Sequence, residues 1–210
     1  MTKTVCQPYS IAILAGGLSK RMGQNKALLP LGGTPVIQRI LNALTPLSDD
    51  LFLVTNTPST YHHLQQPMVS DIVPDKAALG GIYTALEHAR YSWVFVCACD
   101  MPFIDDQVVQ WLADSIQDRD AIVCPYNEDR YPEPLHSLYH KQCSTPIAQS
   151  MQAGQLKISH IFKQVVVHFV PYDRLLQIAR SNNFFLNLNT PTDLEIARNL
   201  VRGQDKRDFA

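Results

Sequence analysis

The sequence lacks a strong charge of either sign. Its 210 residues include 18 lysines and arginines against 19 aspartates and glutamates, which gives a formal net charge of −1. A nearly neutral chain has no overall field that would draw it to nucleic acid or to an acidic membrane. We therefore expect neither of these partners, and any anion that the protein binds must be held by a local site.

Long hydrophobic runs are also missing. The segment Met1 to Ser10 is polar and leads into only a short apolar run, so it matches neither a signal peptide nor a membrane span. This predicts a cytoplasmic protein. The five cysteines are scattered and form no C-x-x-C pair, which argues against a disulfide framework or a zinc site. Cys97 and Cys99 alternate in an apolar run and are interpreted as small buried hydrophobic residues.

Several common catalytic signatures are absent. There is no Walker A sequence, because five residues rather than four separate Gly17 from Gly23, and Gln24 stands where a lysine is required. The dinucleotide fingerprint G-x-G-x-x-G, the zinc motif H-E-x-x-H and the serine-hydrolase motif G-x-S-x-G do not occur either. None of these chemistries is therefore supported.

The chain does have a glycine turn between a strand and a basic loop. The stretch S-I-A-I-L-A-G-G-L-S-K-R-M-G-Q-N-K reads as a buried strand at 11–15, the pair Gly16 and Gly17, and a loop with Lys20, Arg21 and Lys26. Glycines let backbone amides point at anionic oxygens, and basic side chains add charge-assisted hydrogen bonds. The stretch predicts a phosphate site; a tight turn with a solvated basic loop and no ligand is the alternative.

Strand-like and helix-like patterns alternate after this loop. Strands are expected at 51–55, 69–73, 93–98 and 121–124, with helices between them that open at Thr34-Pro35, at Gly80-Gly81 and at Asp105-Asp106. Near-continuous apolar strands separated by helices indicate a parallel sheet covered on both sides. The fold class expected is α/β, with three layers and a mostly parallel central sheet covered by helices on both faces.

The pattern loosens beyond Cys124. We expect 135–139 to be a strand of a separate small layer, 155–162 a helical turn, 165–170 a strand, and 191–201 a last helix capped by Thr190. Residues 203–210 read as a flexible tail. The segment 1–202 is interpreted as one domain, with a nucleotide half at about 1–124 and an acceptor half at about 125–202.

Polar residues follow three of the predicted strands. In open α/β sheets, ligands bind at the carboxyl ends of the strands. Asn56, Asp75 and Asp100 each come just after a strand, as Gly16 does, so all three are candidate site residues. For Asp100 the alternative is a capping role before Met101.

Three motifs resemble the molybdenum cofactor guanylyltransferases, nucleotidyltransferases with a Rossmann-like fold. They are L-A-G-G-L-S-K-R-M-G-Q-N-K, C-D-M-P at 99–102 and N-L-N-T-P-T-D-L at 187–194. The resemblance implies transfer of GMP from GTP to molybdopterin, with release of pyrophosphate and Mg²⁺ as the cofactor. GTP and molybdopterin are the implied partners, and proteins of cofactor synthesis or acceptor molybdoenzymes are candidate protein partners.

The resemblance also assigns roles to individual residues. It makes Arg21, Lys26 and Asp100 the catalytic residues and Asp100 the metal ligand. The residues that it implies at the nucleotide are Leu14, Ala15, Gly16, Gly17, Lys26, Asn56, Asp75 and Asp100. Asn187 and Asn189 either tie the last helix to the sheet or lie beside the active site.

Two alternatives stay open. A cytidylyltransferase, or another transferase acting on a phosphorylated acceptor, would keep the reaction and change the substrates. Gly17 favours guanine, since relatives that take a pyrimidine often read L-A-A-G. A nucleotide-binding protein without catalysis would keep the glycines and Lys26 but would not need Asp100 to hold a metal.

Overall fold

A seven-stranded sheet organises the computed structural model, which describes residues 7–16 and 25–205. The strand order is β5-β4-β1-β6-β8-β7-β9, and every neighbouring pair is parallel except the two pairs that β8 makes. The strands are β1 (Tyr9–Leu14), β4 (Leu51–Val54), β5 (Met68–Val69), β6 (Trp93–Ala98), β7 (Ile122–Pro125), β8 (His136–His140) and β9 (Val167–Val170), and β2 (Pro30–Leu31) and β3 (Thr34–Pro35) form a separate hairpin.

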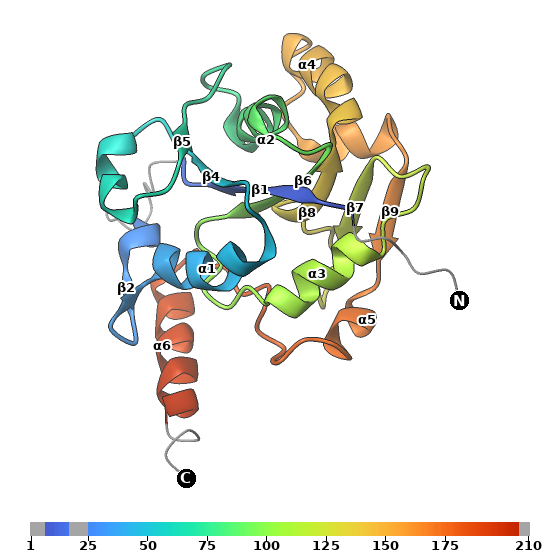
Figure 1. Cartoon of the computed structure of the whole chain (residues 1–210). Helices are drawn as coiled ribbons and strands as arrows, with labels where there is room; N and C mark the ends of the chain where they lie inside the picture. Colours follow the sequence, from blue (N-terminus) through green and yellow to red (C-terminus); the bar gives the residue numbers. More distant parts are fainter. Residues whose placement is uncertain (1–6, 17–24, 206–210) are drawn as a thin grey trace.

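Helices connect the strands and cover both faces of the sheet (Figure 1). The α-helices are α1 (Val36–Leu44), α2 (Ala77–His88), α3 (Asp106–Asp114), α4 (Ser144–Gln152), α5 (Tyr172–Leu176) and α6 (Pro191–Asp205). Short 3₁₀ helices lie between them: η1 (Lys26–Leu28), η2 (Thr45–Leu47), η3 (Pro58–Thr60), η4 (His62–Leu64), η5 (Lys141–Cys143) and η6 (Ile158–Lys163). None of the helices within the described part of the chain is long and apolar enough to span a bilayer.

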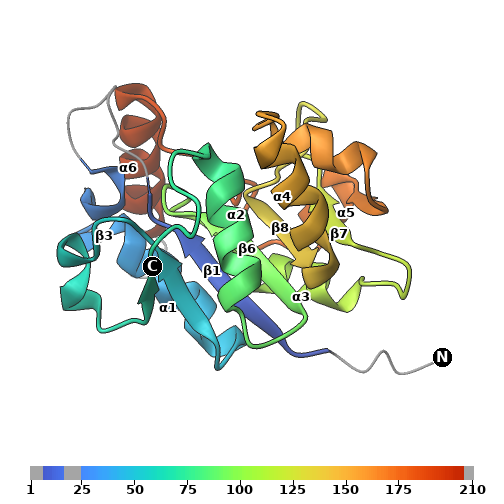
Figure 2. The same cartoon turned by 90° about the horizontal axis from the view of Figure 1, so that it is seen from above.

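Two hydrophobic clusters show that the sheet is the middle of three layers. One cluster joins β1 and β6 to α1, α3 and α6 on one face, through residues such as Ile40, Val109 and Ala197. The other joins the opposite face to α2 and α4, through Ile82 and Ile147. The views in Figures 1 and 2 agree, with α2 and α4 on the side of the sheet opposite to α1 and α3. The expected α/β fold class with a mostly parallel sheet is confirmed.

Two strand predictions were wrong. The strand β8 belongs to the main sheet, where it runs antiparallel between β6 and β7, and not to a separate layer. Apolar residues mark a strand as buried but do not say which strand lies beside it, so the sequence could not place β8. The strand expected at 69–73 is only Met68–Val69, because the chain turns away after pairing Val69 with Val54.

Helix boundaries also differ from the prediction at three places. Thr34 and Pro35 form β3, and α1 begins only at Val36, without a side-chain cap. The helix α2 begins at Ala77, before the glycine pair. The last helix extends to Asp205, so 203–205 are helical and only 206–210 of the expected tail lie outside the described residues. The predicted cap at Thr190 is confirmed, since its Oγ1 accepts from the N–H of Asp193 at 3.2 Å.

Candidate active site at the carboxyl rim of the sheet

The register of the strands brings three predicted site residues to one rim. Leu14 at the end of β1 pairs with Val54 of β4 and with Ala98 of β6. Gly16, Asn56 and Asp100 each follow these paired residues by two positions, so they leave the sheet at the same level. We call this border, where β5, β4, β1 and β6 end, the carboxyl rim.

The fourth strand of the rim contributes an aspartate that the sequence analysis passed over. Val69 pairs with Val54, so Asp71 occupies the place on β5 that Asn56 occupies on β4. The Asn56 Nδ2 donates to Asp71 Oδ2 at 2.8 Å, and the Asp71 N–H donates to Asn56 Oδ1 at 2.9 Å. Asp75 lies further along the connection to α2, exposed and with φ at 60°. Asp71 was passed over because β5 ends at Val69, earlier than the sequence pattern predicted.

Lys26, Asp100 and Asn189 meet at the other end of the rim. The Lys26 Nζ lies 3.6 Å from Asp100 Oδ2 and donates to Asn189 Oδ1 at 3.1 Å. The backbone of Asn189 is held in turn, because its N–H donates to Asp193 Oδ2 at 2.8 Å at the start of α6. Asn189 therefore both belongs to the cap of α6 and lies beside the predicted catalytic residues. Asn187 turns elsewhere, donating to the Phe185 carbonyl at 3.1 Å.

The carboxylate of Asp100 is partly withdrawn from water. Burial raises its pKa above the ordinary value, while the neighbouring Lys26 ammonium and hydrogen bonds act in the opposite direction. The side chains of Asp100 and Lys26 are 20% and 15% exposed. A charged pair in such a place interacts strongly with whatever enters the site, since little water screens it.

The residues at the end of β1 pass from the buried sheet to the exposed rim. Leu14 and Ala15 are buried and Gly16 is exposed. A Cβ on Gly81 of α2 would lie 3.1 Å from Leu14 Cδ1, so glycine at this position lets the helix approach the strand end closely. Two predicted site residues, Gly17 and Arg21, lie outside the described residues, as does Lys20.

The metal-ligand prediction rests on a single carboxylate. Within 7–16 and 25–205 no group of three or more histidine, cysteine, aspartate or glutamate side chains could hold an ion. Asp100 alone suits a hard cation that takes its remaining ligands from phosphate oxygens and water, as Mg²⁺ commonly does. The donor at the rim therefore fits a nucleotide-bound Mg²⁺ better than a metal held by protein alone.

The neighbouring thiols are not activated. Burial raises the pKa of Cys99 to about 12 and that of Cys97 further still, so neither would supply a thiolate at neutral pH. Cys97 is fully buried, as expected, whereas Cys99 is partly exposed.

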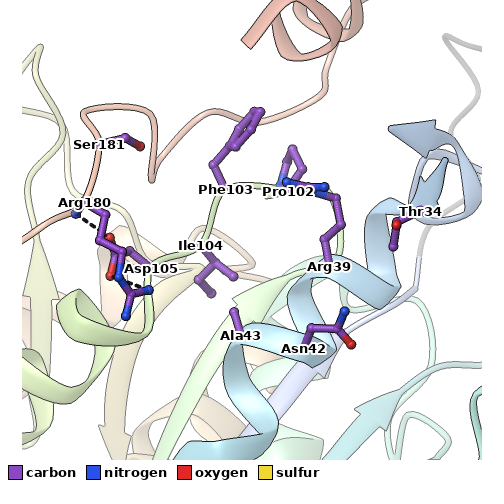
Figure 3. A pocket seen from close by; sticks show the side chains of 10 residues that line it. All are labelled: Thr34, Arg39, Asn42, Ala43, Pro102, Phe103, Ile104, Asp105, Arg180 and Ser181. Carbon is purple, nitrogen blue, oxygen red and sulfur yellow. Dashed lines mark hydrogen bonds and ion pairs between the residues drawn. The ribbon is translucent and has the colours of Figure 1, made fainter. Parts of the chain in front are cut away.

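A pocket of about 450 Å³ lies along the segment that follows Asp100 (Figure 3). Its walls come from β3, from α1, from this segment and from the loop before α6: Thr34, Arg39, Asn42, Ala43, Pro102, Phe103, Ile104, Asp105, Arg180 and Ser181. Figure 3 shows Arg39 turned toward Pro102 and Arg180 turned toward Asp105. None of the predicted site residues lines this pocket.

The chain as a whole is similar in sequence to known proteins. The sequence model of the MobA-like NTP transferase domain matches residues 11–168. A probable molybdenum cofactor guanylyltransferase of Carboxydothermus hydrogenoformans is 37% identical over 90% of this chain and 94% of its own length. The molybdenum cofactor guanylyltransferase of Vibrio atlanticus is 32% identical over 88% and 93%.

Solved structures of other proteins are also similar to this chain. Molybdopterin-guanine dinucleotide biosynthesis protein A from Archaeoglobus fulgidus superposes with a TM-score of 0.80 at 25% identity, over 92% of this chain and 99% of that one. A 2-C-methyl-D-erythritol 4-phosphate cytidylyltransferase from Thermus thermophilus has a TM-score of 0.68 at 16% identity, over 93% and 99%. This second likeness shows the fold alone.

Proposed function

The chain belongs to the MobA-like NTP transferase family, and from this premise we propose that it transfers GMP from GTP to molybdopterin and releases pyrophosphate. The relatives named molybdenum cofactor guanylyltransferase support the choice of substrates, since they align over most of both chains. The observation that carries the proposal is the meeting of Lys26 and Asp100, 3.6 Å apart, at the rim where β1 and β6 end.

The rim offers polar groups at the ends of four adjacent strands. Asp71, Asn56, Gly16 and Asp100 follow four adjacent strands in the order β5-β4-β1-β6. Three strand spacings of about 4.8 Å make a span of about 14 Å. We place the nucleoside toward Asn56 and the two aspartates of the β5 connection, Asp71 and Asp75, and the phosphates toward Lys26 and Asp100.

The reaction requires the protein to position the substrates and to neutralise charge, and it does not require a general base. The terminal phosphate oxygen of molybdopterin, already a nucleophile at neutral pH, attacks the α-phosphorus of GTP, and the bond to pyrophosphate breaks. Charge repulsion between the two anions is the obstacle. Lys26, and Arg21 five residues earlier in the sequence, would neutralise the leaving pyrophosphate through charge-assisted hydrogen bonds. The buried surroundings of Lys26 make its charge more effective.

Asp100 would hold Mg²⁺, which would supply positive charge against the negative charge that develops on the phosphates. Lys26 belongs to η1 and Asp100 follows β6, and their charged groups lie 3.6 Å apart, so the two groups can face the same triphosphate from different elements. Asn189 gives Lys26 a neutral partner that remains available when Asp100 turns to the metal. Leu14 at the end of β1 and the residues that follow it in the sequence, Ala15, Gly16 and Gly17, would contact the nucleotide.

Nucleotide choice is the sharpest test of this proposal. Pyrophosphate release should be measured with GTP, CTP, ATP and UTP, each with Mg²⁺ and molybdopterin. We expect turnover with GTP only when both Mg²⁺ and molybdopterin are present. Preferential turnover with CTP would make the protein a cytidylyltransferase, and tight nucleotide binding without any pyrophosphate release would make it a binding protein.

A further inference from the structure

A buried tyrosine from another part of the chain supports the segment that carries Lys26. Tyr61 lies in the connection between β4 and β5, between η3 and η4, and is only 2% exposed. Its hydroxyl oxygen accepts from Asn25 Nδ2 at 2.9 Å. The same two side chains can also pair with the tyrosine as donor, since its hydroxyl lies 3.3 Å from Asn25 Oδ1.

Asn25 in turn forms a hydrogen bond with the backbone next to Lys26. Its Oδ1 accepts from the N–H of Ala27 at 3.1 Å, which caps η1. A 3₁₀ helix of three residues has little stability of its own, so its geometry depends on such side-chain contacts. The hydroxyl of Tyr61 fixes the amide of Asn25, and the amide fixes the turn from which the Lys26 side chain departs.

In the proposed reaction the Nζ of Lys26 exchanges its hydrogen-bond partners, whereas the backbone of Lys26 stays in place. Without nucleotide, Nζ is shared between Asp100 and Asn189. A triphosphate and its metal would both compete for these groups. A lysine whose backbone is held in advance spends less conformational entropy in capturing the phosphates than one on a loose turn.

We propose that Tyr61 is a positioning residue, which acts through Asn25 to hold Lys26 where it meets the triphosphate. This inference rests on the proposed function and adds to it a residue outside all three sequence motifs. Burial raises the pKa of Tyr61, so the hydroxyl stays protonated over the working range and the hydrogen bond to Asn25 is not lost by ionisation. The same connection carries Asn56, so it would contact the nucleotide site at two points.

The variant Tyr61→Phe isolates the hydroxyl, because phenylalanine keeps the ring and its packing. Loss of one hydrogen bond to a neutral partner corresponds to a weakening of GTP binding by roughly three- to tenfold. The dissociation constant should be measured by titration calorimetry with GTP and Mg²⁺. Tyr91→Phe is the matched control, since it also removes one tyrosine hydroxyl. That hydroxyl donates to Asp49 at 2.8 Å, two residues before β4 begins. We expect Tyr91→Phe to leave the dissociation constant unchanged.

A double-mutant cycle distinguishes positioning from simple structural support. In a Lys26→Met background Tyr61→Phe should change GTP binding by less than about 1.5-fold, because the group that it positions is gone. An equal loss in both backgrounds, or wild-type binding in the single variant, would overturn the inference. The cycle uses binding alone, so it is independent of turnover: absence of GTP-dependent pyrophosphate release in the wild type would refute the proposed function and leave this test intact.

Discussion

Asp100 combines an unfavourable effect on the fold with the role in activity that we propose for it. Burial raises its pKa despite the nearby Lys26, so the ionised form is less stable in the folded protein than in water. A folded-state pKa above the unfolded value means that ionised Asp100 opposes folding at neutral pH. Selection for stability alone would not keep a carboxylate at this position.

Replacing Asp100 with alanine should therefore separate activity from stability. We expect Asp100→Ala to reduce GTP-dependent pyrophosphate release at least about a hundredfold, since the metal would lose its protein ligand. The thermal unfolding midpoint should stay the same or rise, because an unfavourable buried charge is removed. Asp49→Ala, which removes an exposed carboxylate paired with Arg90, is the control and should keep full activity. Unchanged Mg²⁺-dependent turnover in Asp100→Ala would refute its assignment as metal ligand.

His136 is the least satisfied polar residue among those described. It is fully buried in β8, neither ring nitrogen has a hydrogen-bond partner, and it packs edge-on against Phe95 and Phe185, with centroids 5.2 and 4.9 Å away. Burial lowers its pKa to about 3. The imidazole is therefore neutral in the folded protein at any pH near neutrality.

This histidine should make the fold sensitive to acid. Between pH 6.5 and about 3 the unfolded chain binds a proton at His136 that the folded protein does not, so stability falls as the pH drops through this range. The slope from this residue approaches about 1.4 kcal/mol per pH unit. We expect His136→Phe to flatten the loss of stability between pH 7 and pH 5, measured by urea unfolding. His63→Phe, at an exposed position, should retain the wild-type slope; equal slopes in all three proteins would contradict the prediction.

Individual candidate site residues could be predicted from the sequence only where a motif or a clear strand end marked them. Lys26 and Asp100 were predicted from such marks and lie together at the rim. Asp71 was missed because the apolar residues Ile72 and Val73 made the strand look longer than it is, and this moved the expected strand end to Asp75. The register against β4 stops at Val69, and pairing register is a property of two strands that one strand's sequence does not contain.

The β2–β3 hairpin links the segment after Lys26 to the helix that carries the last motif. Its two turn glycines, Gly32 and Gly33, have φ of 60° and 78°, as the tight turn of a two-residue hairpin requires. A Cβ on Gly32 would lie only 2.5 Å from Val201 Cγ1 of α6. The hairpin thus holds α6, whose first turn places Asn189 beside Lys26.

Alanine at the two glycines should separate turn strain from helix packing. Gly33→Ala meets no atom within 4 Å and should cost about 1 kcal/mol for its positive φ. Gly32→Ala carries the same strain and also collides with α6, so we expect a loss of about 2 to 3 kcal/mol in the free energy of unfolding. Denaturant unfolding of both variants measures the difference. Equal losses would mean that α6 does not pack tightly on the turn.

Over the whole molecule, the order of the strands in the sheet crosses the point at which the sequence pattern changes. The pattern of strands and helices loosens after Cys124, and the prediction placed a nucleotide half before about this point and an acceptor half after it. In the structure, β8 from the second half lies between β6 and β7 of the first. The three layers could be predicted from periodicity because each face is locally apolar, but the insertion of β8 could not, because it depends on which strands pair at long range.

We therefore propose that 1–202 folds as one unit and that the fragment 1–124 does not fold alone. In this fragment β7 would have neither of its neighbours, since it pairs only with β8 and β9 in the described sheet. The apolar strand β6 would also lose its partner on one side, and an unpaired buried strand exposes backbone groups and promotes aggregation. The full chain should unfold in one transition, with tryptophan fluorescence and far-UV circular dichroism coinciding. The fragment should show no cooperative transition by either probe, and a fragment that unfolds cooperatively would show that the two halves are separate domains.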